Sequence, residues 1–514
     1  MKYFLGLDNG GTMTKAAIYD KTGREICVAS TATKMIVPAP GFVERDMEEM
    51  WEANCTVIRK ALGKSGISPA DIAGAGVCGH GKGLYLWGKN GHPVRNGIIS
   101  TDNRAWKYSV CWKEDGTEGK TSQLACQNIM ACQPVAILAW LRDHEPECMD
   151  QIAWIFEAKD YVRFRLTGKA QAEFGDSSGA NLINLHKKEY DPELLKLFGL
   201  EQYRDALPPL CEAGKVCGYV TEEAAGKSGL LKGTPVIGGL FDIQACMLAA
   251  DVLTEEKLCM IAGTWSVDLY LSGKPVVEKR LLQYIRNTVF VLPEYYLIEV
   301  GTPASAGNNE WFIRELLPEA AQKAEEEGRS IYEVMNGWVA KLPVGELCPI
   351  FMPYLFGSNV HPHAKSCFVG ITSFHTRKHL ARSVYEGIAF SHRLDLEHLV
   401  ESREDRPEVI RLTGGVAKSR VWTQMFADVM NIPIETVDVN ETGALGCAIA
   451  VAAAVGTYDS MEEAAAAMGR IAGRVEPIPE HVEIYNKKYD LYRKTIQALN
   501  SVWDAYRSLE DNGL

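Results

Sequence analysis

One pattern occurs twice in this 514-residue chain: a short hydrophobic strand, a glycine turn and a second strand. The first copy runs from Tyr3 to Asp20 around Gly10-Gly11-Thr12, and the second runs from Cys259 to Leu271 around Gly263-Thr264. Strand-forming residues on both sides of a glycine turn predict a β-hairpin. Because the copies lie about half the chain length apart, they make an internal duplication a candidate, although two hairpins alone are weak proof of a repeat.

Strand and helix patterns alternate along the rest of the chain. The segments 47–62, 135–142, 376–399, 418–430, 443–455 and 484–509 predict helices, and the apolar runs 72–77 and 409–412 predict strands. Such alternation indicates α/β domains in which helices cover sheets. Because residues 251–257 interrupt the apolar pattern, we expect two domains, 1–252 and 253–514.

The composition is that of a packed globular protein, with 46% hydrophobic and 23% charged residues. Its 54 basic and 66 acidic residues leave a formal net charge of -12, which argues against nucleic acid as a partner. No apolar stretch reaches the roughly 18 residues of a membrane span, so we expect a cytoplasmic protein without a membrane partner. The 14 cysteines are scattered without a CxxC pair, which indicates reduced thiols. Dimerisation stays open, with a homodimer as one of the alternatives.

Three glycine-rich elements are candidates for a nucleotide site. Gly11-Thr12 and Gly263-Thr264 are the hairpin tips, and Gly414-Gly415 follow the strand at 409–412. A glycine turn with a hydroxyl residue points backbone N–H groups at one spot, which suits a phosphate oxygen. A hairpin needs glycine for its own geometry as well, so one such turn is weak evidence. Three together favour a bound nucleotide, since ligands of α/β folds collect beyond strand ends.

Two acidic residues follow predicted strands. Asp8 stands beside the first turn, where it can coordinate Mg²⁺, a hard cation that prefers carboxylate and phosphate oxygens, or shape the loop as an Asx turn. Asp242 enters a helix of small residues after Gly238-Gly239. There it can cap the helix or accept a proton from a hydroxyl nucleophile. The sequence pattern leaves both pairs of alternatives open.

Two polar loops contain candidates for binding a polyol. His80 and Lys82 follow the strand at 72–77, and Asp102 and Arg104 lie in Ser100–Arg104. Their side chains can supply the matched donors and acceptors that sugar hydroxyls require. The alternatives are a surface turn for the first loop and a solvated ion pair of little energetic value for the second.

The ordered set of motifs resembles the FGGY carbohydrate kinases of the actin-like ATPase superfamily, over nearly the whole chain. The matching segments are Asp8–Thr12, Gly41–Asp46, Ala158–Tyr161, Leu166–Gly168, Asp176–Gly179, Gly238–Asp242, Gly263-Thr264, Tyr385–Gly387, Gly414–Ser419 and Glu441–Gly446. The resemblance implies an α/β fold of two actin-like (ribonuclease H-like) domains with an interdomain cleft. Domain 1–252 would bind the sugar and carry the catalytic base, and domain 253–514, with its terminal helix, would bind the nucleotide.

The resemblance also assigns roles to individual residues. It makes Asp242 the general base and Asp8 the Mg²⁺-associated carboxylate. The remaining implied contacts are Gly11, Thr12, Gly263 and Thr264 for phosphates, Gly414, Gly415 and Ser419 for adenosine, and His80, Lys82, Asp102, Arg104 and Asp242 for the sugar. Many family members have Thr or Ser where this chain has Gly11, so backbone N–H donors would serve there.

The implied reaction is ATP-dependent, Mg²⁺-assisted phosphorylation of a terminal hydroxyl of a small ketose or polyol. Within the family the chain is most similar to the L-xylulose kinases, and an erythritol or D-xylulose kinase is the alternative. D-xylulose kinases typically carry Met-His where this chain has Gly81-Lys82, which makes Lys82 a candidate specificity residue. An alternative from another class is an actin-like ATPase acting as a chaperone or switch, whose ATP turnover would be indifferent to sugars. The retained Asp8 and Asp242 argue against a catalytically dead sugar-binding regulator.

Overall fold

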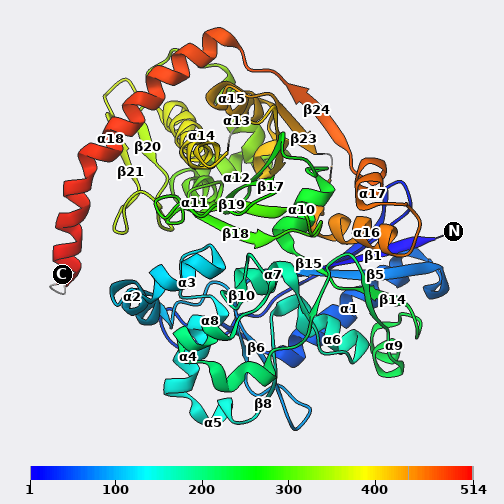
Figure 1. The fold of residues 1–514 in the computed structure, drawn as a ribbon. Coiled ribbons are helices and arrows are strands. Elements are labelled where there is room, and N and C mark those ends of the chain that lie inside the picture. Colours follow the sequence, from blue (N-terminus) through cyan, green and yellow to red (C-terminus); the bar gives the residue numbers. More distant parts are fainter. Residues whose placement is uncertain (1, 404, 438, 512–514) are drawn as a thin grey trace. The chain divides into compact units, whose positions relative to one another are not determined.

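The computed structural model, shown in Figure 1, describes residues 2–403, 405–437 and 439–511. The chain forms two compact units. The first comprises Met1–Leu253, Leu271–Ile298 and Val439–Arg470, and the second comprises Thr254–Tyr270, Glu299–Asp438 and Ile471–Leu514. Each unit thus gathers separate stretches of the chain, whereas the domains expected from the sequence, 1–252 and 253–514, are continuous. The division at residue 252 stays a prediction.

The first unit is built on a mixed sheet. Its strands are β1 (Tyr3–Asn9), β2 (Met13–Tyr19), β3 (Glu25–Ala32), β5 (Ile72–Gly79), β13 (Val216–Tyr219), β14 (Pro235–Ile237) and β15 (Leu240–Phe241). The order is β13-β14-β5-β1-β2-β3, and β15 also pairs with β5. β1 and β2 form the predicted antiparallel hairpin, and β1 pairs in parallel with β5 on its other side.

The central strands of the second unit repeat this arrangement. They are β16 (Lys257–Ala262), β17 (Ser266–Ser272), β22 (Val409–Gly414), β23 (Ile434–Val437) and β24 (Ile471–Val475). β16 and β17 form the second predicted hairpin, and β16 pairs in parallel with β22. Each unit therefore has a glycine-tipped hairpin with a parallel strand on its free side, as a duplication predicts.

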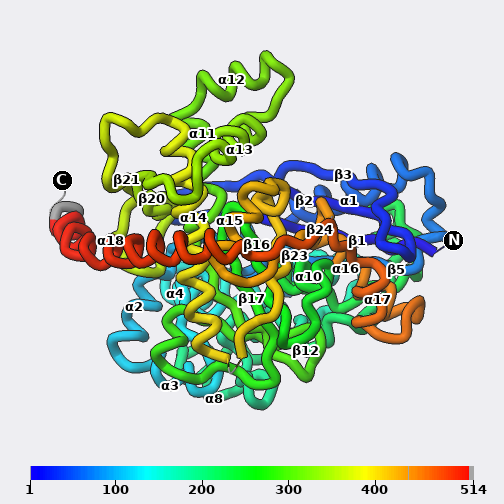
Figure 2. The backbone as a smooth tube through the Cα atoms, turned by 90° about the horizontal axis from the view of Figure 1, so that it is seen from above, coloured from blue at the N-terminus to red at the C-terminus, as the bar shows by residue number. Residues whose placement is uncertain are grey.

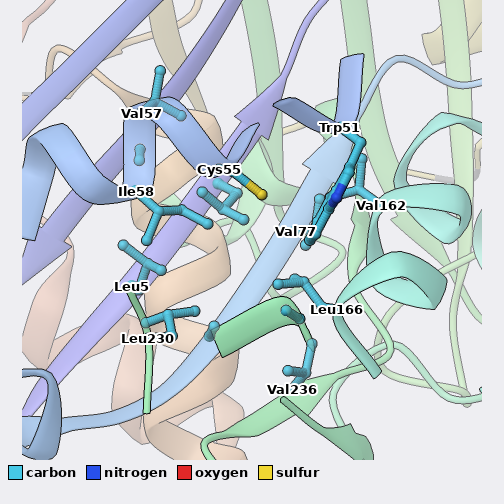
Figure 3. Packing of buried hydrophobic residues seen from close by; sticks show 14 of the residues in the cluster. Leu5, Trp51, Cys55, Val57, Ile58, Val77, Val162, Leu166, Leu230 and Val236 are labelled. Carbon is cyan, nitrogen blue, oxygen red and sulfur yellow. The ribbon is translucent and has the colours of Figure 1, made fainter. Parts of the chain in front are cut away.

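The core of the first unit joins the sheet to α1 (Met47–Ser65) and α6 (Ala158–Thr167). Asp46 caps α1 by accepting a hydrogen bond from the Glu49 N–H, and Gly66 ends the helix at φ 67°. Figure 3 labels ten side chains of this cluster, Leu5, Trp51, Cys55, Val57, Ile58, Val77, Val162, Leu166, Leu230 and Val236. Since they come from several strands and helices, one apolar cluster ties the sheet to its covering layer.

Small residues bring two further helices close to the sheet of the first unit. α16 (Thr442–Ala454) packs against β1, β5 and α10 (Asp242–Ala249), although it lies far from them in the sequence (Figure 1). A Cβ on Gly446 would lie 2.0 Å from the carbonyl oxygen of Ala245, so only glycine fits there. This close packing fixes where α10 and α16 begin, and both helices begin beside Asp8.

Of the four helices predicted within 253–514, one (443–455) is α16 of the first unit, and three belong to the second unit. They are α14 (Arg377–Glu401), α15 (Arg420–Met430) and α18 (Pro479–Asp511), which Figure 2 shows as one long helix. Phe390 of α14 packs against Tyr485, Tyr489 and Tyr492 of α18, and these ring contacts attach the terminal helix to its unit. Within the part of the chain that the structure describes, none of the helices combines the length and the hydrophobicity of a membrane span.

Candidate active site

Three parallel strands of the first unit end in one row. The register places Asn9 of β1, Gly79 of β5 and Phe241 of β15 side by side. His80 and Asp242 follow these strand ends directly. Because the carboxyl ends of parallel strands meet at one edge of a sheet, residues that are far apart in the sequence become neighbours there.

Asp8 lies one residue before this row and next to the start of α16. Its Oδ2 would be 2.9 Å from a Cβ placed on Gly443. Burial raises the pKa of Asp8 to about 6, although the nearby Lys15 ammonium opposes the rise and Glu441 adds to it. Lys15 Nζ lies 2.7 Å from Glu441 Oε2, so this cation is held beside the carboxyl.

Asp242 is the first residue of α10, and Phe241 is the N-cap. The Asp242 Oδ1 accepts a hydrogen bond of 2.7 Å from the Ile243 N–H. Burial raises the pKa of Asp242 to about 8, and the carboxylates of Asp8 and Asp176 add to the rise while Lys82 opposes it. A carboxyl group with such a pKa can both take up and release a proton near neutral pH.

The loop that holds His80 and Lys82 packs against Phe241. His80 is only 7% exposed, and its Nε2 lies 2.9 Å from the Tyr85 hydroxyl, so the surface-turn alternative is wrong for this residue. Burial lowers the pKa of His80 to about 4, which leaves the ring neutral at neutral pH. A Cβ on Gly81 would lie 2.6 Å from the Phe241 ring, and Lys82 Nζ lies 5.9 Å from the centroid of that ring. The loop therefore carries a cation to the neighbourhood of Asp242.

A buried charge network, which had no assigned role in the sequence, supports the same region. Lys159 Nζ lies 2.7 Å from Asp176 Oδ2, 3.3 Å from Asp160 Oδ1 and 3.4 Å from Glu173 Oε2. Burial raises the pKa of Asp176 to about 7 although Lys159 opposes the rise. The segments Ala158–Tyr161 and Asp176–Gly179 were noted in the sequence as family motifs. Neither segment by itself indicates that the charged side chains of the two contact each other.

Asp102 and Arg104 form a buried ion pair, and the alternative of a solvated pair is wrong. They are 2% and 5% exposed, and Arg104 Nη2 lies 2.9 Å from Asp102 Oδ2. The same nitrogen lies 2.8 Å from Glu44 Oε1, and the guanidinium stacks over the rings of Phe42 and Trp140. Asp102 also accepts a hydrogen bond of 2.6 Å from the Val43 N–H. The two side chains hold the 42–44 segment, and their contact with a sugar stays a prediction.

The glycine turn of the first unit is open. Gly11 and Thr12 connect β1 to β2, and the Thr12 side chain is exposed. Among the described residues, and apart from Gly11 and its two chain neighbours, no atom lies within 4 Å of the position that a Cβ on Gly11 would take. The turn therefore leaves room for a ligand beside its backbone.

In the second unit the structure brings two predicted glycine elements together. Ala262 pairs with Gly414 across β16 and β22, so Gly263-Thr264 and Gly414-Gly415 leave neighbouring strand ends. Gly414 has φ 90°, and a Cβ on it would lie 2.5 Å from the Ala262 carbonyl oxygen. Glycine is required there both for its backbone conformation and for the close approach of the strands.

Ser419 has a structural role that the resemblance did not indicate. Its hydroxyl caps α15 by accepting a hydrogen bond from the Trp422 N–H and donates one of 2.7 Å to Asn336 Oδ1. Tyr385 donates to the same Asn336 oxygen and stacks on Trp422 with ring centroids 4.0 Å apart. The hydroxyl keeps one acceptor position for a ligand.

Comparison with known proteins matches both halves of the chain. Residues 3–249 match the FGGY family of carbohydrate kinases, N-terminal domain, and residues 258–455 match its C-terminal domain. The L-xylulose/3-keto-L-gulonate kinase of Escherichia coli is 37% identical over 507 residues, covering 97% of each chain. A probable L-xylulose kinase of Pasteurella multocida is 35% identical, covering 98% of this chain and 100% of its own.

Solved structures agree with this assignment. The xylulose kinase of Lactobacillus acidophilus has a TM-score of 0.89 at 23% identity, covering 98% of this chain and 100% of its own. The xylulose kinase of Rhodospirillum rubrum has a TM-score of 0.87 at 24% identity, with the same coverage. These likenesses confirm the predicted two-domain, actin-like α/β fold. With both domains matched, the chain belongs to the FGGY family of carbohydrate kinases, and the predicted kinase class is confirmed.

Proposed function

We propose that the protein is an L-xylulose kinase that transfers the γ-phosphate of ATP to a terminal hydroxyl of the sugar. The observation that carries the proposal is the neighbourhood of Asp8 and Asp242, two buried carboxyl groups with raised pKa values, of which Asp8 adds to the rise of the Asp242 pKa. The relatives named for L-xylulose, 37% and 35% identical, support this sugar. We place the reaction in the cytoplasm, where ATP is available.

Asp242 accepts the proton of the attacking hydroxyl. A general base works best when its pKa lies near the working pH, and the pKa of Asp242 is about 8. Phosphoryl transfer has a loose transition state, so alignment and charge neutralisation contribute most of the catalysis. The carboxylate therefore orients the hydroxyl and removes its proton, while other groups neutralise the phosphate charge.

The chemistry of Asp8 fits Mg²⁺. Its carboxyl is buried near Glu441, whose charge adds to the rise of the Asp8 pKa, and Asp8 in turn raises the pKa of Asp242. A divalent cation would relieve this repulsion between carboxylates. Mg²⁺ needs only one or two carboxylates when phosphates and waters complete its shell. When bound, Mg²⁺ would neutralise the developing charge on the phosphate oxygens.

Both glycine turns serve the nucleotide in this proposal. Gly11, Thr12, Gly263 and Thr264 contact phosphates through backbone N–H groups and threonine hydroxyls. Gly414, Gly415 and Ser419 face the adenosine, for which the Ser419 hydroxyl has one acceptor position left.

The sugar lies beside the 80–82 loop. Lys82 donates to a sugar hydroxyl from a position near Asp242, and His80 adds a neutral ring hydrogen-bonded to Tyr85. Asp102 and Arg104 belong to the proposed sugar site, where their buried ion pair holds the 42–44 segment in position.

The proposal is tested by coupling ADP release to an absorbance assay. The panel contains L-xylulose, D-xylulose, erythritol, xylitol and 3-keto-L-gulonate, and the last sugar is included because one relative carries its name. We expect the highest kcat/KM for L-xylulose. A higher value for another sugar would reject L-xylulose as the substrate, and ATP turnover that no sugar increases would favour the chaperone or switch alternative.

A further inference from the structure

The ring of His392 lies at the centre of a buried polar cluster in the second unit. His392 belongs to α14 and is fully buried. Its Nδ1 lies 2.9 Å from Ser266 Oγ and 3.2 Å from Asp268 Oδ1, and its Nε2 lies 3.0 Å from Ser305 Oγ. One ring thus connects two segments that the sequence separates by about forty residues.

Both segments flank the Gly263-Thr264 turn. Ser266 begins β17 two residues after Thr264, and Ser305 precedes Ala306, whose N–H donates a hydrogen bond of 2.9 Å to the Gly263 carbonyl oxygen. The turn also touches the start of α11 (Gly307–Leu316), where a Cβ on Gly307 would lie 3.1 Å from the Thr264 carbonyl oxygen. A displacement of either segment would therefore move the turn.

The polar groups around the ring depend on it. With its proton on Nδ1, His392 donates toward Ser266 and Asp268 and accepts from the Ser305 hydroxyl at Nε2. The other oxygen of Asp268, Oδ2, is buried without a hydrogen-bond partner, so His392 is its main compensation. Burial raises the pKa of Asp268, and His392 opposes the rise. Loss of the ring leaves the Asp268 carboxyl and the Ser305 hydroxyl buried without the partner that the ring supplies.

We propose that His392 is a positioning residue for ATP, because it holds both flanks of the Gly263-Thr264 turn in the geometry that meets a phosphate. The proposal rests on the phosphate role proposed above for this turn. Donors that are held in place in advance cost no reorganisation when the charged group arrives. A small misplacement of such donors lowers affinity and rate strongly.

Two substitutions test the two nitrogen positions of the His392 ring separately. His392→Asn keeps an amide near the Nδ1 position, on the side of Ser266 and Asp268, and His392→Gln keeps one near the Nε2 position, on the side of Ser305. We expect each to raise the KM for ATP and the Kd for ADP by roughly tenfold, the effect of one buried polar partner left unsatisfied. The KM for the sugar should stay unchanged. His398→Asn, about 9 Å further along α14, is the matched control and should change neither KM.

The measurements on these variants distinguish a positioning role of His392 from a purely stabilising one. A lower unfolding temperature with an unchanged KM for ATP, or equal changes in both KM values, would overturn the proposal. Should the ring be essential for folding, Ser305→Ala removes only one hydroxyl and must give the same selective rise. Thr264→Val tests the phosphate role independently. If it raises the KM for ATP while the His392 variants do not, only the positioning role fails, and if it has no effect, the phosphate assignment of the turn fails.

Discussion

The rate of phosphoryl transfer is expected to follow the ionisation of Asp242. Burial and the nearby carboxylates of Asp8 and Asp176 raise its pKa to about 8, and only the ionised form can take a proton from the sugar. At this pKa the ionised fraction is about 1% at pH 6, about 9% at pH 7 and about 50% at pH 8. The value of kcat/KM should therefore rise roughly tenfold from pH 6 to 7 and about fivefold from pH 7 to 8.

Asp8 makes the acid side of this profile steeper. Its pKa is raised to about 6, so it becomes protonated over the range in which Asp242 is already neutral. A protonated Asp8 can no longer attract a divalent cation. Below pH 6 the slope of log kcat/KM against pH should therefore exceed one.

The measurement is initial velocity at saturating Mg²⁺ and ATP and at sugar concentrations below KM, with coupling enzymes checked at each pH. Asp242→Asn should lower kcat/KM by roughly 10²- to 10⁴-fold, the usual contribution of a positioned base, and should remove the tenfold step between pH 6 and 7. Asp242→Glu, which keeps an ionisable group, should retain a pH-dependent limb. A flat wild-type profile from pH 6 to 8, or near-normal turnover of folded Asp242→Asn, would refute the role of this carboxylate.

Substitutions at four positions should separate specificity, folding, nucleotide binding and charge burial. Lys82→Met should lower kcat/KM for L-xylulose by the equivalent of about 1–3 kcal/mol, and should lower it less for D-xylulose. An equal loss for both sugars would assign Lys82 to the loop instead. Arg104→Leu leaves the Asp102 carboxylate buried without its cation and should cost about 3–5 kcal/mol in urea unfolding, whereas a loss below about 1 kcal/mol would contradict a buried pair. Gly414→Ala forces a methyl group to 2.5 Å from a backbone oxygen and should weaken ADP binding in calorimetry without changing the KM for the sugar; unchanged ADP affinity would speak against this site. In the folded protein Asp242 keeps its proton up to about pH 8, whereas in the unfolded chain it loses the proton near pH 3.8. The stability that the protonated carboxyl contributes is therefore lost as pH rises through this window. The unfolding temperature of Asp242→Asn relative to wild type should therefore increase from pH 5 to pH 8, and a constant difference would contradict the raised pKa.

Local patterns in the sequence were sufficient for the two hairpins, the strands that pair with them and six of the helices. The two hairpins, α1 and α14 lie where strand-forming residues, glycine turns and helical periodicity predict them. These signals are local because each depends on residues within a few positions of one another. The third glycine element, Gly414-Gly415, was also recognisable as a strand end. Its expected contact with adenosine came from the family resemblance, which depends on the whole ordered set of motifs.

Local patterns could not predict which side chains are buried or which residues they contact. Asp102 and Arg104 lie in a polar loop of the sequence, yet Glu44 and the rings of Phe42 and Trp140 surround the Arg104 guanidinium. Lys159 and Asp176 stand seventeen residues apart and meet at 2.7 Å. Such contacts depend on which distant segments pack together, and a local pattern carries no information about that.

The sequence by itself determined the glycine turns, the acids beside them and the family to which they belong, because those features are encoded in short ordered motifs. Only the tertiary structure decided that Asp8 lies close enough to raise the pKa of Asp242, that His80 is buried and neutral, and that His392 joins the two flanks of the Gly263-Thr264 turn. The physical reason is that a pKa and a hydrogen-bond network depend on burial and on neighbours from remote parts of the chain, which exist only after the chain has folded.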